Sequence, residues 1–218
     1  MKFKAVIFDL DGTLLNTLDD LADSCNQVLE KNGFPTHTID EVRMFVGNGL
    51  GVLIEKALPS GKENPQYQKV LQEMRETYAN NWQNKTRAYD GVLDLINELS
   101  SCGVKMGIVS NKPDAQVKEL ASLYFKGIPA SCAIGEKESE GIKRKPSPDS
   151  VFAVLKKLGV EKHEALYVGD SDVDIKTANN AGLFCVSVLW GFRSEDFLKA
   201  NGAKCFIKTP SELLEIVL

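Results

Sequence analysis

The chain has 218 residues, of which 43% are hydrophobic and 26% charged, a composition typical of an ordinary globular protein. Its formal net charge of −4 and its lack of a clustered basic face argue against a general nucleic-acid binder. No apolar run approaches the roughly 18 residues of a membrane span, and the N-terminus has no signal-peptide layout. The five cysteines are scattered without a C-x-x-C pair, so we expect buried free thiols in a reducing cytoplasm.

The first predicted element is a buried strand over residues 4–8, which ends directly in Asp9-Leu-Asp11-Gly12-Thr13. Two carboxylates at the end of a buried strand repel each other and lose hydration. A cation, a proton or a reacting group must therefore occupy the space between them. A surface turn would also use Asp and Gly, but largely apolar residues precede this motif. The motif indicates chemistry on a negatively charged substrate, with phosphate as the leading candidate.

Residues 14–87 show helical periodicity and no convincing strand. Met74, Tyr78 and Trp82 recur at four-residue spacing, which favours core packing over a cofactor site. The glycines between residues 47 and 51 have the wrong spacing for a dinucleotide site. We expect this segment to be a loop that approaches the substrate.

From residue 89 onward, strands and helices alternate. The predicted strands cover 104–109, 132–134, 165–168 and 184–188, the predicted helices 113–125, 148–158 and a segment ending near 182, and short elements follow near 205–207 and 210–217. This alternation predicts an α/β fold with a Rossmann-like, doubly wound parallel sheet. The first strand joins that sheet, because alone it could not bury both of its faces. The expected domains are an α/β catalytic core of residues 1–13 and 88–218 and an inserted α-helical cap of residues 14–87, which would lie over the site like a lid.

Polar side chains follow three of the predicted strands. They occur in Asp9-Leu-Asp11, in Ser110-Asn111-Lys112 and in Gly169-Asp170-Ser171. Parallel strands direct these ends to one crevice, and Lys145, which precedes a helix and is followed by prolines, can reach the same place. Two other interpretations stay open here. Ser110 could be a helix N-cap, and Lys145 could belong to a solvated basic run.

This set of residues fits phosphoryl transfer. Mg²⁺ prefers oxygen ligands, and Asp9 and Asp170 can supply carboxylates to it. A carboxylate screened by the metal can attack phosphorus to form an aspartyl-phosphate. Ser110 and Lys145 would neutralise the transferring group, while Asp11 would protonate the leaving alcohol and later activate water.

With these residues in place, the sequence resembles the haloacid dehalogenase-like phosphatases. Their four signatures are matched in order by Asp9-Leu-Asp11-Gly12-Thr13, Ser110, Lys145-Pro146, and Gly169-Asp170-Ser171 with Asp174. The resemblance implies that Asp9 is the nucleophile and Asp11 the acid/base. It also implies that Asp9, the Asp11 carbonyl and Asp170 hold Mg²⁺, that Ser110 and Lys145 bind the phosphoryl group, and that Asp174 lies just outside the direct metal ligands.

Within that family, two segments are similar to those of phosphoglycolate phosphatases. They are Phe45-Val-Gly47-Asn48-Gly49 and Leu189-Trp190-Gly191-Phe192-Arg193-Ser194 with Gly202-Ala203. Asn16 is a departure, because many relatives have an acid at this point near the cap hinge. The candidate substrate-binding residues are Thr13, Asn111, Gly47 and Asn48. Arg193 could meet a substrate carboxylate, but we expect it to be an ordinary surface charge.

The leading functional prediction is a cytoplasmic, Mg²⁺-dependent phosphatase that acts on a small phosphorylated metabolite, most naturally 2-phosphoglycolate. A sugar phosphomutase of the β-phosphoglucomutase type and a pyrophosphatase are the alternatives on the same fold. A non-catalytic binding protein is a third class, which the complete set of predicted catalytic residues disfavours. No nucleic-acid or membrane partner is expected, and the sequence leaves both a monomer and a homodimer open.

Overall fold

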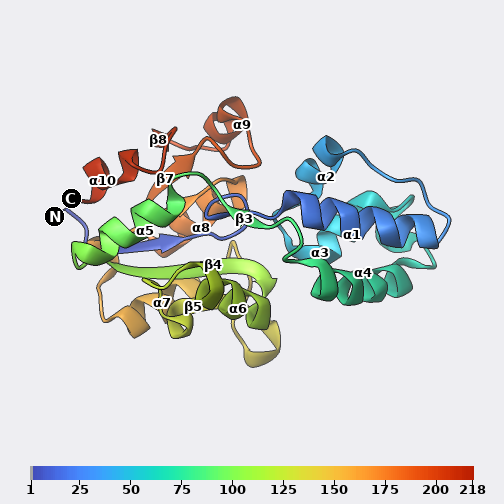
Figure 1. Ribbon diagram of the computed structural model, residues 1–218, viewed down its shortest axis with the longest axis horizontal. Helices are drawn as coiled ribbons and strands as arrows, with labels where there is room; N and C mark the ends of the chain where they lie inside the picture. Colours follow the sequence, from blue (N-terminus) through green and yellow to red (C-terminus); the bar gives the residue numbers. More distant parts are fainter. Residues whose placement is uncertain (1) are drawn as a thin grey trace. The chain divides into compact units, whose positions relative to one another are not determined.

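The computed structural model describes residues 2–218. The chain forms two compact units (Figure 1). One unit contains the segment up to Leu14 together with Ala88–Leu218, and the other is Leu15–Arg87.

The first unit contains a six-stranded sheet with the strand order β5-β4-β1-β6-β7-β8. Its strands are β1 (Ala5–Phe8), β4 (Lys105–Pro113), β5 (Ala133–Glu136), β6 (Ala165–Gly169), β7 (Phe184–Val188) and β8 (Phe206–Ile207). All neighbouring pairs are parallel. β1 lies in the middle of the sheet and is fully buried, as expected for a strand covered on both faces.

Helices connect these strands and cover both faces of the sheet. They are α5 (Val92–Ser101), α6 (Asp114–Tyr124), α7 (Asp149–Leu158), α8 (Asp172–Ala181), α9 (Glu195–Ala200) and α10 (Glu212–Val217), with 3-10 turns at Ala130–Cys132, Glu138–Glu140 and Lys162–Glu164. α7 and α8 pack on the face that presents Ile7 and Tyr167. The residues that alternate with these along each strand point to the opposite face of the sheet. On that face, the side chains of Ile96 of α5 and Met106 of β4 both lie next to Gly127. The predicted doubly wound α/β fold is thus confirmed.

The second unit is helical. It contains α1 (Leu18–Lys31), α2 (Ile39–Phe45), α3 (Gly49–Ala57) and α4 (Tyr67–Asn81), with a 3-10 turn at Gly61–Glu63. α1 packs against α4 and α2, and α3 packs against α4. Met74, Tyr78 and Trp82 are buried in this unit, so their four-residue spacing does reflect core packing.

The structure differs from the predicted elements at several points. β2 (Leu15–Asn16) and β3 (Arg87–Ala88) form a two-stranded sheet that the sequence did not predict, because two-residue strands are too short to show periodicity. β4 continues to Pro113, and Pro113 rather than Ser110 precedes α6. The interpretation of Ser110 as a helix N-cap is therefore wrong.

All five cysteines are free, but only Cys25 and Cys132 are buried, while Cys102 is exposed and the other two are partly exposed. The expectation that all the thiols are buried is wrong. Among residues 2–218, no helix combines the length and apolar character needed to cross a bilayer.

Candidate active site

The register of the sheet explains how three distant segments meet. Phe8 of β1 pairs with Ile108 of β4 and with Val168 of β6. Two residues after these paired positions, the three segments reach Leu10, Ser110 and Asp170, and Asp9 directly precedes Leu10. Parallel strands end at the same edge, so their polar residues gather there.

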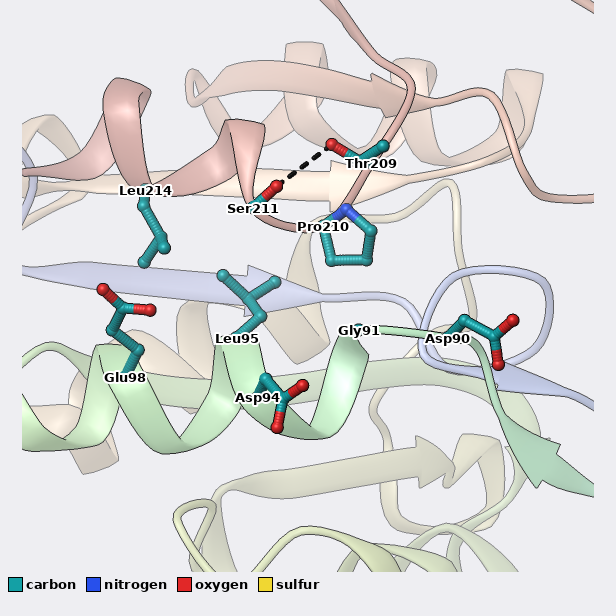
Figure 2. A pocket seen from close by; sticks show the side chains of 9 residues that line it. All are labelled: Asp90, Gly91, Asp94, Leu95, Glu98, Thr209, Pro210, Ser211 and Leu214. Carbon is teal, nitrogen blue, oxygen red and sulfur yellow. Dashed lines mark hydrogen bonds between the residues drawn. The ribbon is translucent and has the colours of Figure 1, made fainter.

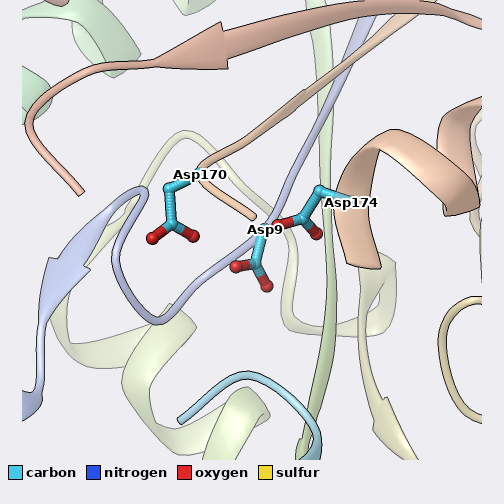
Figure 3. Close-up of side chains that lie close together, drawn as sticks. All are labelled: Asp9, Asp170 and Asp174. Atoms are coloured by element: carbon cyan, nitrogen blue, oxygen red, sulfur yellow. The ribbon is translucent and has the colours of Figure 1, made fainter. Parts of the chain in front are cut away.

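Three carboxylates meet at this edge (Figure 3). Asp9, Asp170 and Asp174 are buried, and one oxygen of each lies within 4.8 Å of the others. Burial, followed by repulsion from Asp174, raises the pKa of Asp9 well above its ordinary value. The same two causes raise the pKa of Asp170 to about 7. A buried all-oxygen donor set with this excess of negative charge fits a hard divalent cation such as Mg²⁺.

Lys145 is the cation that faces two of these carboxylates. Its Nζ donates to Oδ1 of Asp9 at 2.6 Å and to Oδ1 of Asp174 at 2.8 Å. Burial lowers the pKa of Lys145, but the two carboxylates outweigh that effect, so its pKa lies above the ordinary value and the side chain is charged. With only 4% of its surface exposed, Lys145 does not belong to a solvated basic run.

Asn111 holds the backbone of Lys145 in place. Its Oδ1 accepts from the Lys145 N–H at 2.8 Å, and its Nδ2 donates to the Lys145 carbonyl at 3.2 Å. The side chain that the sequence suggested for substrate binding is thus engaged with the segment that carries Lys145.

Asp174 lies in the first turn of α8, where Ser171 is the N-cap. The Ser171 hydroxyl donates to Oδ2 of Asp174 at 2.5 Å, and the Tyr167 hydroxyl donates to Oδ1 at 3.0 Å. Both carboxylate oxygens therefore have protein partners besides Lys145. These bonds hold Asp174 beside Asp9 and Asp170.

The carboxylate of Asp11 is held by two side chains of β4. Ser110 Oγ donates to its Oδ2 at 3.3 Å, and Lys112 Nζ donates to its Oδ1 at 2.9 Å. Sequence reasoning placed Lys112 beside the site but gave it no role. Its position two residues after Ser110, at the carboxyl end of β4, was the signal that could have assigned one.

The remaining predicted residues fall into two groups. Thr13 is buried, and its hydroxyl has no hydrogen-bond partner among the described residues, while its carbonyl accepts from Trp190 Nε1 at 3.0 Å. Gly47 and Asn48 lie between α2 and α3 in the helical unit. Asn16 Oδ1 accepts from the Leu18 N–H at 3.2 Å, so this departure from many relatives keeps an oxygen at the start of α1.

Sequence reasoning was wrong about Arg193, which is buried rather than a surface charge. Its guanidinium lies 5.7 Å from the centre of the Phe197 ring. Its positive charge also lowers the pKa of Asp170, although less than burial and Asp174 raise it.

A separate cavity of about 270 Å³ lies in the first unit, between α5 and the segment that leads into α10 (Figure 2). Asp90, Asp94 and Glu98 contribute its acidic groups, and Leu95, Pro210 and Leu214 its apolar ones. None of the predicted site residues lines it.

Comparison with known proteins agrees with this geometry. Residues 6–188 match the model of the haloacid dehalogenase-like hydrolase family. A phosphoglycolate phosphatase of Pseudomonas savastanoi pv. phaseolicola is 34% identical over 87% of this chain and 70% of its own length. A phosphoglycolate phosphatase of Vibrio parahaemolyticus is 32% identical over 98% of this chain and 96% of its own length. The crystal structure of a candidate phosphoglycolate phosphatase from Lactobacillus delbrueckii subsp. bulgaricus superimposes with a TM-score of 0.94, is 35% identical, and covers 100% of this chain and 99% of its own. The chain therefore belongs to the haloacid dehalogenase-like hydrolase family and to its phosphoglycolate phosphatase-like branch.

Proposed function

We propose that this enzyme is a Mg²⁺-dependent phosphatase that hydrolyses 2-phosphoglycolate through an aspartyl-phosphate on Asp9. The observation that carries the proposal is the meeting of Asp9, Asp170 and Asp174 with the buried ammonium of Lys145. The substrate is inferred from the relatives, which are named phosphoglycolate phosphatases.

In the first half of the proposed reaction, a carboxylate oxygen of Asp9 forms a bond to phosphorus. The bond between phosphorus and the ester oxygen breaks, and Asp11 gives its proton to the departing alkoxide. In the second half, Asp11 takes a proton from water, whose oxygen attacks the same phosphorus and releases Asp9. Asp11 is thereby protonated again, and the products are an alcohol and inorganic phosphate.

The surrounding residues supply positive charge and orientation. Lys145 lies 2.6 Å from Asp9, so its ammonium is placed to neutralise phosphoryl oxygens as they approach. The Ser110 hydroxyl, which donates to Asp11 at 3.3 Å, would turn to a phosphoryl oxygen when the substrate binds. Asp9, Asp170 and the Asp11 carbonyl would hold Mg²⁺, which supplies charge neutralisation for the nucleophile and the phosphoryl group.

The proposal extends to the helical unit, which we take to be the cap. Its Gly47 and Asn48 would contact the substrate, and a closed cap would exclude water and strengthen the electrostatics of the site.

The test is phosphate release from 2-phosphoglycolate, hexose phosphates and pyrophosphate, with Mg²⁺ and with EDTA. Asp9→Asn should reduce the rate by at least about 10³-fold, because the nucleophile is lost. The matched control is Asp172→Asn, since Asp172 pairs with Lys176 on the exposed side of α8. That control should keep the wild-type rate.

The outcomes separate the candidate functions. Mg²⁺-dependent release with a preference for 2-phosphoglycolate supports the proposal. Conversion between hexose phosphates without net phosphate release would replace it with a mutase, and a preference for pyrophosphate would replace it with a pyrophosphatase. Full activity of Asp9→Asn would reject the covalent mechanism.

A further inference from the structure

The segment after β7 contacts the site through two of its residues. The Trp190 indole Nε1–H donates to the carbonyl of Thr13 at 3.0 Å. The backbone N–H of Phe192 donates to Oδ2 of Asp170 at 2.7 Å. Two residues of one short loop thus hold two parts of the site that lie far apart in the sequence.

Gly191, between them, fits where no other residue would. A Cβ at this position would overlap with Cβ of Asp170 and with the carbonyl oxygen of Gly12. Gly12 has a φ of 93°, and a Cβ there would overlap with the Asp170 carboxylate and approach the Phe192 ring to 2.9 Å. The turn after Asp11, the side chain of Asp170 and the loop from Trp190 to Phe192 therefore pack so closely that only glycine fits at positions 12 and 191.

This contact bears on cation binding. Asp170 is buried among like charges, and the Phe192 N–H is a donor aimed at one of its two oxygens. That bond fixes how the carboxylate is turned and leaves the other oxygen for a cation. The Trp190 bond fixes the turn in which the Asp11 carbonyl lies, because Thr13 is only two residues further along the chain.

We propose that Trp190, Gly191 and Phe192 form a positioning segment for the cation site, so that Mg²⁺ affinity depends on this loop and Trp190 senses cation binding. The inference rests on the cation site of the proposed function. It assigns no contact with substrate to these residues; they act through Asp170 and the Gly12–Thr13 turn.

The main variant is Trp190→Phe, which keeps an aromatic ring and removes the indole donor. Trp82→Phe is its matched control, because Trp82 is the other tryptophan and lies buried in the helical unit. Calorimetric titration of the proteins with Mg²⁺ should show the dissociation constant raised about 3- to 10-fold in Trp190→Phe, the usual effect of losing one hydrogen bond. The control should bind Mg²⁺ like the wild type.

Trp82→Phe also leaves Trp190 as the only tryptophan, so its fluorescence reports on the loop. We expect its emission to change during Mg²⁺ titration with the midpoint found by calorimetry. A second pair of variants tests the close packing. Gly191→Ala should weaken Mg²⁺ binding by more than about 10-fold through overpacking. Gly51→Ala should not, because its Cβ would meet only the Tyr67 hydroxyl at 3.5 Å.

A purely structural role would lower the unfolding temperature in EDTA without changing the Mg²⁺ dissociation constant. Unchanged Mg²⁺ affinity in both Trp190→Phe and Gly191→Ala, with folded protein, would therefore overturn the inference. A wild-type protein that binds no Mg²⁺ would instead overturn the proposed cation site itself, which is a separate result.

Discussion

Lys112 and Ser110 together define the position of the Asp11 carboxylate. The Lys112 side chain is 4% exposed and lies 2.9 Å from Asp11, whose own side chain is 15% exposed. The backbone N–H of Lys112 also donates to Ser110 Oγ at 3.1 Å, which orients that hydroxyl toward Asp11. One residue thus supports Asp11 twice, once through its ammonium and once through its backbone.

Lys112→Met removes the ammonium and keeps the backbone bond and most of the side-chain volume. We expect kcat to fall about 10- to 100-fold, because a charge-assisted hydrogen bond to the acid/base is lost. KM should change much less, and Lys112→Arg should recover part of the activity. Steady-state kinetics would test this, with Lys118→Met as a control on the more exposed pair with Asp114. A normal kcat in Lys112→Met would show that Asp11 needs no such support.

Among the secondary-structure elements, α1 is tied to the end of its own helical unit by a buried acid. The carboxylate of Asp20 accepts hydrogen bonds from the backbone N–H groups of Lys85 and Thr86 at 2.9 and 2.8 Å, and from the Thr86 hydroxyl at 2.8 Å. The two bonds to Thr86 are buried, so they satisfy polar groups that are shielded from water.

Asp20→Ala leaves those donors without their acceptor. We expect the free energy of unfolding to fall by about 2–4 kcal/mol, measured by urea denaturation. Asp23→Ala is the matched control, because Asp23 lies on the same helix and forms an exposed pair with Lys85 Nζ at 2.6 Å. In this control the free energy of unfolding should fall by less than about 1 kcal/mol. Equal effects of the two variants would contradict this reading of α1.

For the whole molecule, the buried carboxyl groups of Asp9 and Asp170 make the free energy of unfolding depend on pH. Burial and repulsion from Asp174 raise the pKa of Asp170 to about 7 in the folded, metal-free protein, and the pKa of Asp9 is also raised. In an unfolded chain an aspartate has a pKa of about 3.9. A carboxyl with a raised folded pKa stabilises the fold below about pH 4, and that contribution is lost as the pH rises through about 7.

In EDTA, Asp170 should therefore make the free energy of unfolding fall by up to about 1.4 kcal/mol per pH unit between pH 5 and 7. Excess Mg²⁺ should stabilise the protein more at pH 8 than at pH 5.5, because at low pH protons compete for the same carboxylates. Urea denaturation at the two pH values, with and without Mg²⁺, measures both effects. Asp170→Asn should show a shallower slope, and an unchanged slope would assign the effect to other groups.

Local sequence patterns predict the bounds of some strands and helices well. The strand over 184–188 is predicted with its observed bounds, and the helix predicted over 148–158 is observed as α7, Asp149–Leu158. Apolar periodicity is a local property, so it survives in any context that buries those residues. The end of β4 was misplaced because Ser110, Asn111 and Lys112 are polar, yet the strand continues through them. Their polar groups are satisfied by partners such as Lys145 and Asp11, which are remote in the sequence.

The sequence by itself determined the order of the polar strand ends, the parallel α/β class and the residues proposed for phosphoryl transfer, because these depend on local pattern and on motif spacing. Only the tertiary structure decided which side chains meet. Lys112 pairs with Asp11 across 101 positions, and Trp190 reaches Thr13 across 177. The tertiary structure likewise decided that Arg193 is buried and that Gly191 packs closely against Asp170. Such contacts depend on the sheet register and on close packing between segments that have no neighbouring sequence in common, so no local pattern encodes them.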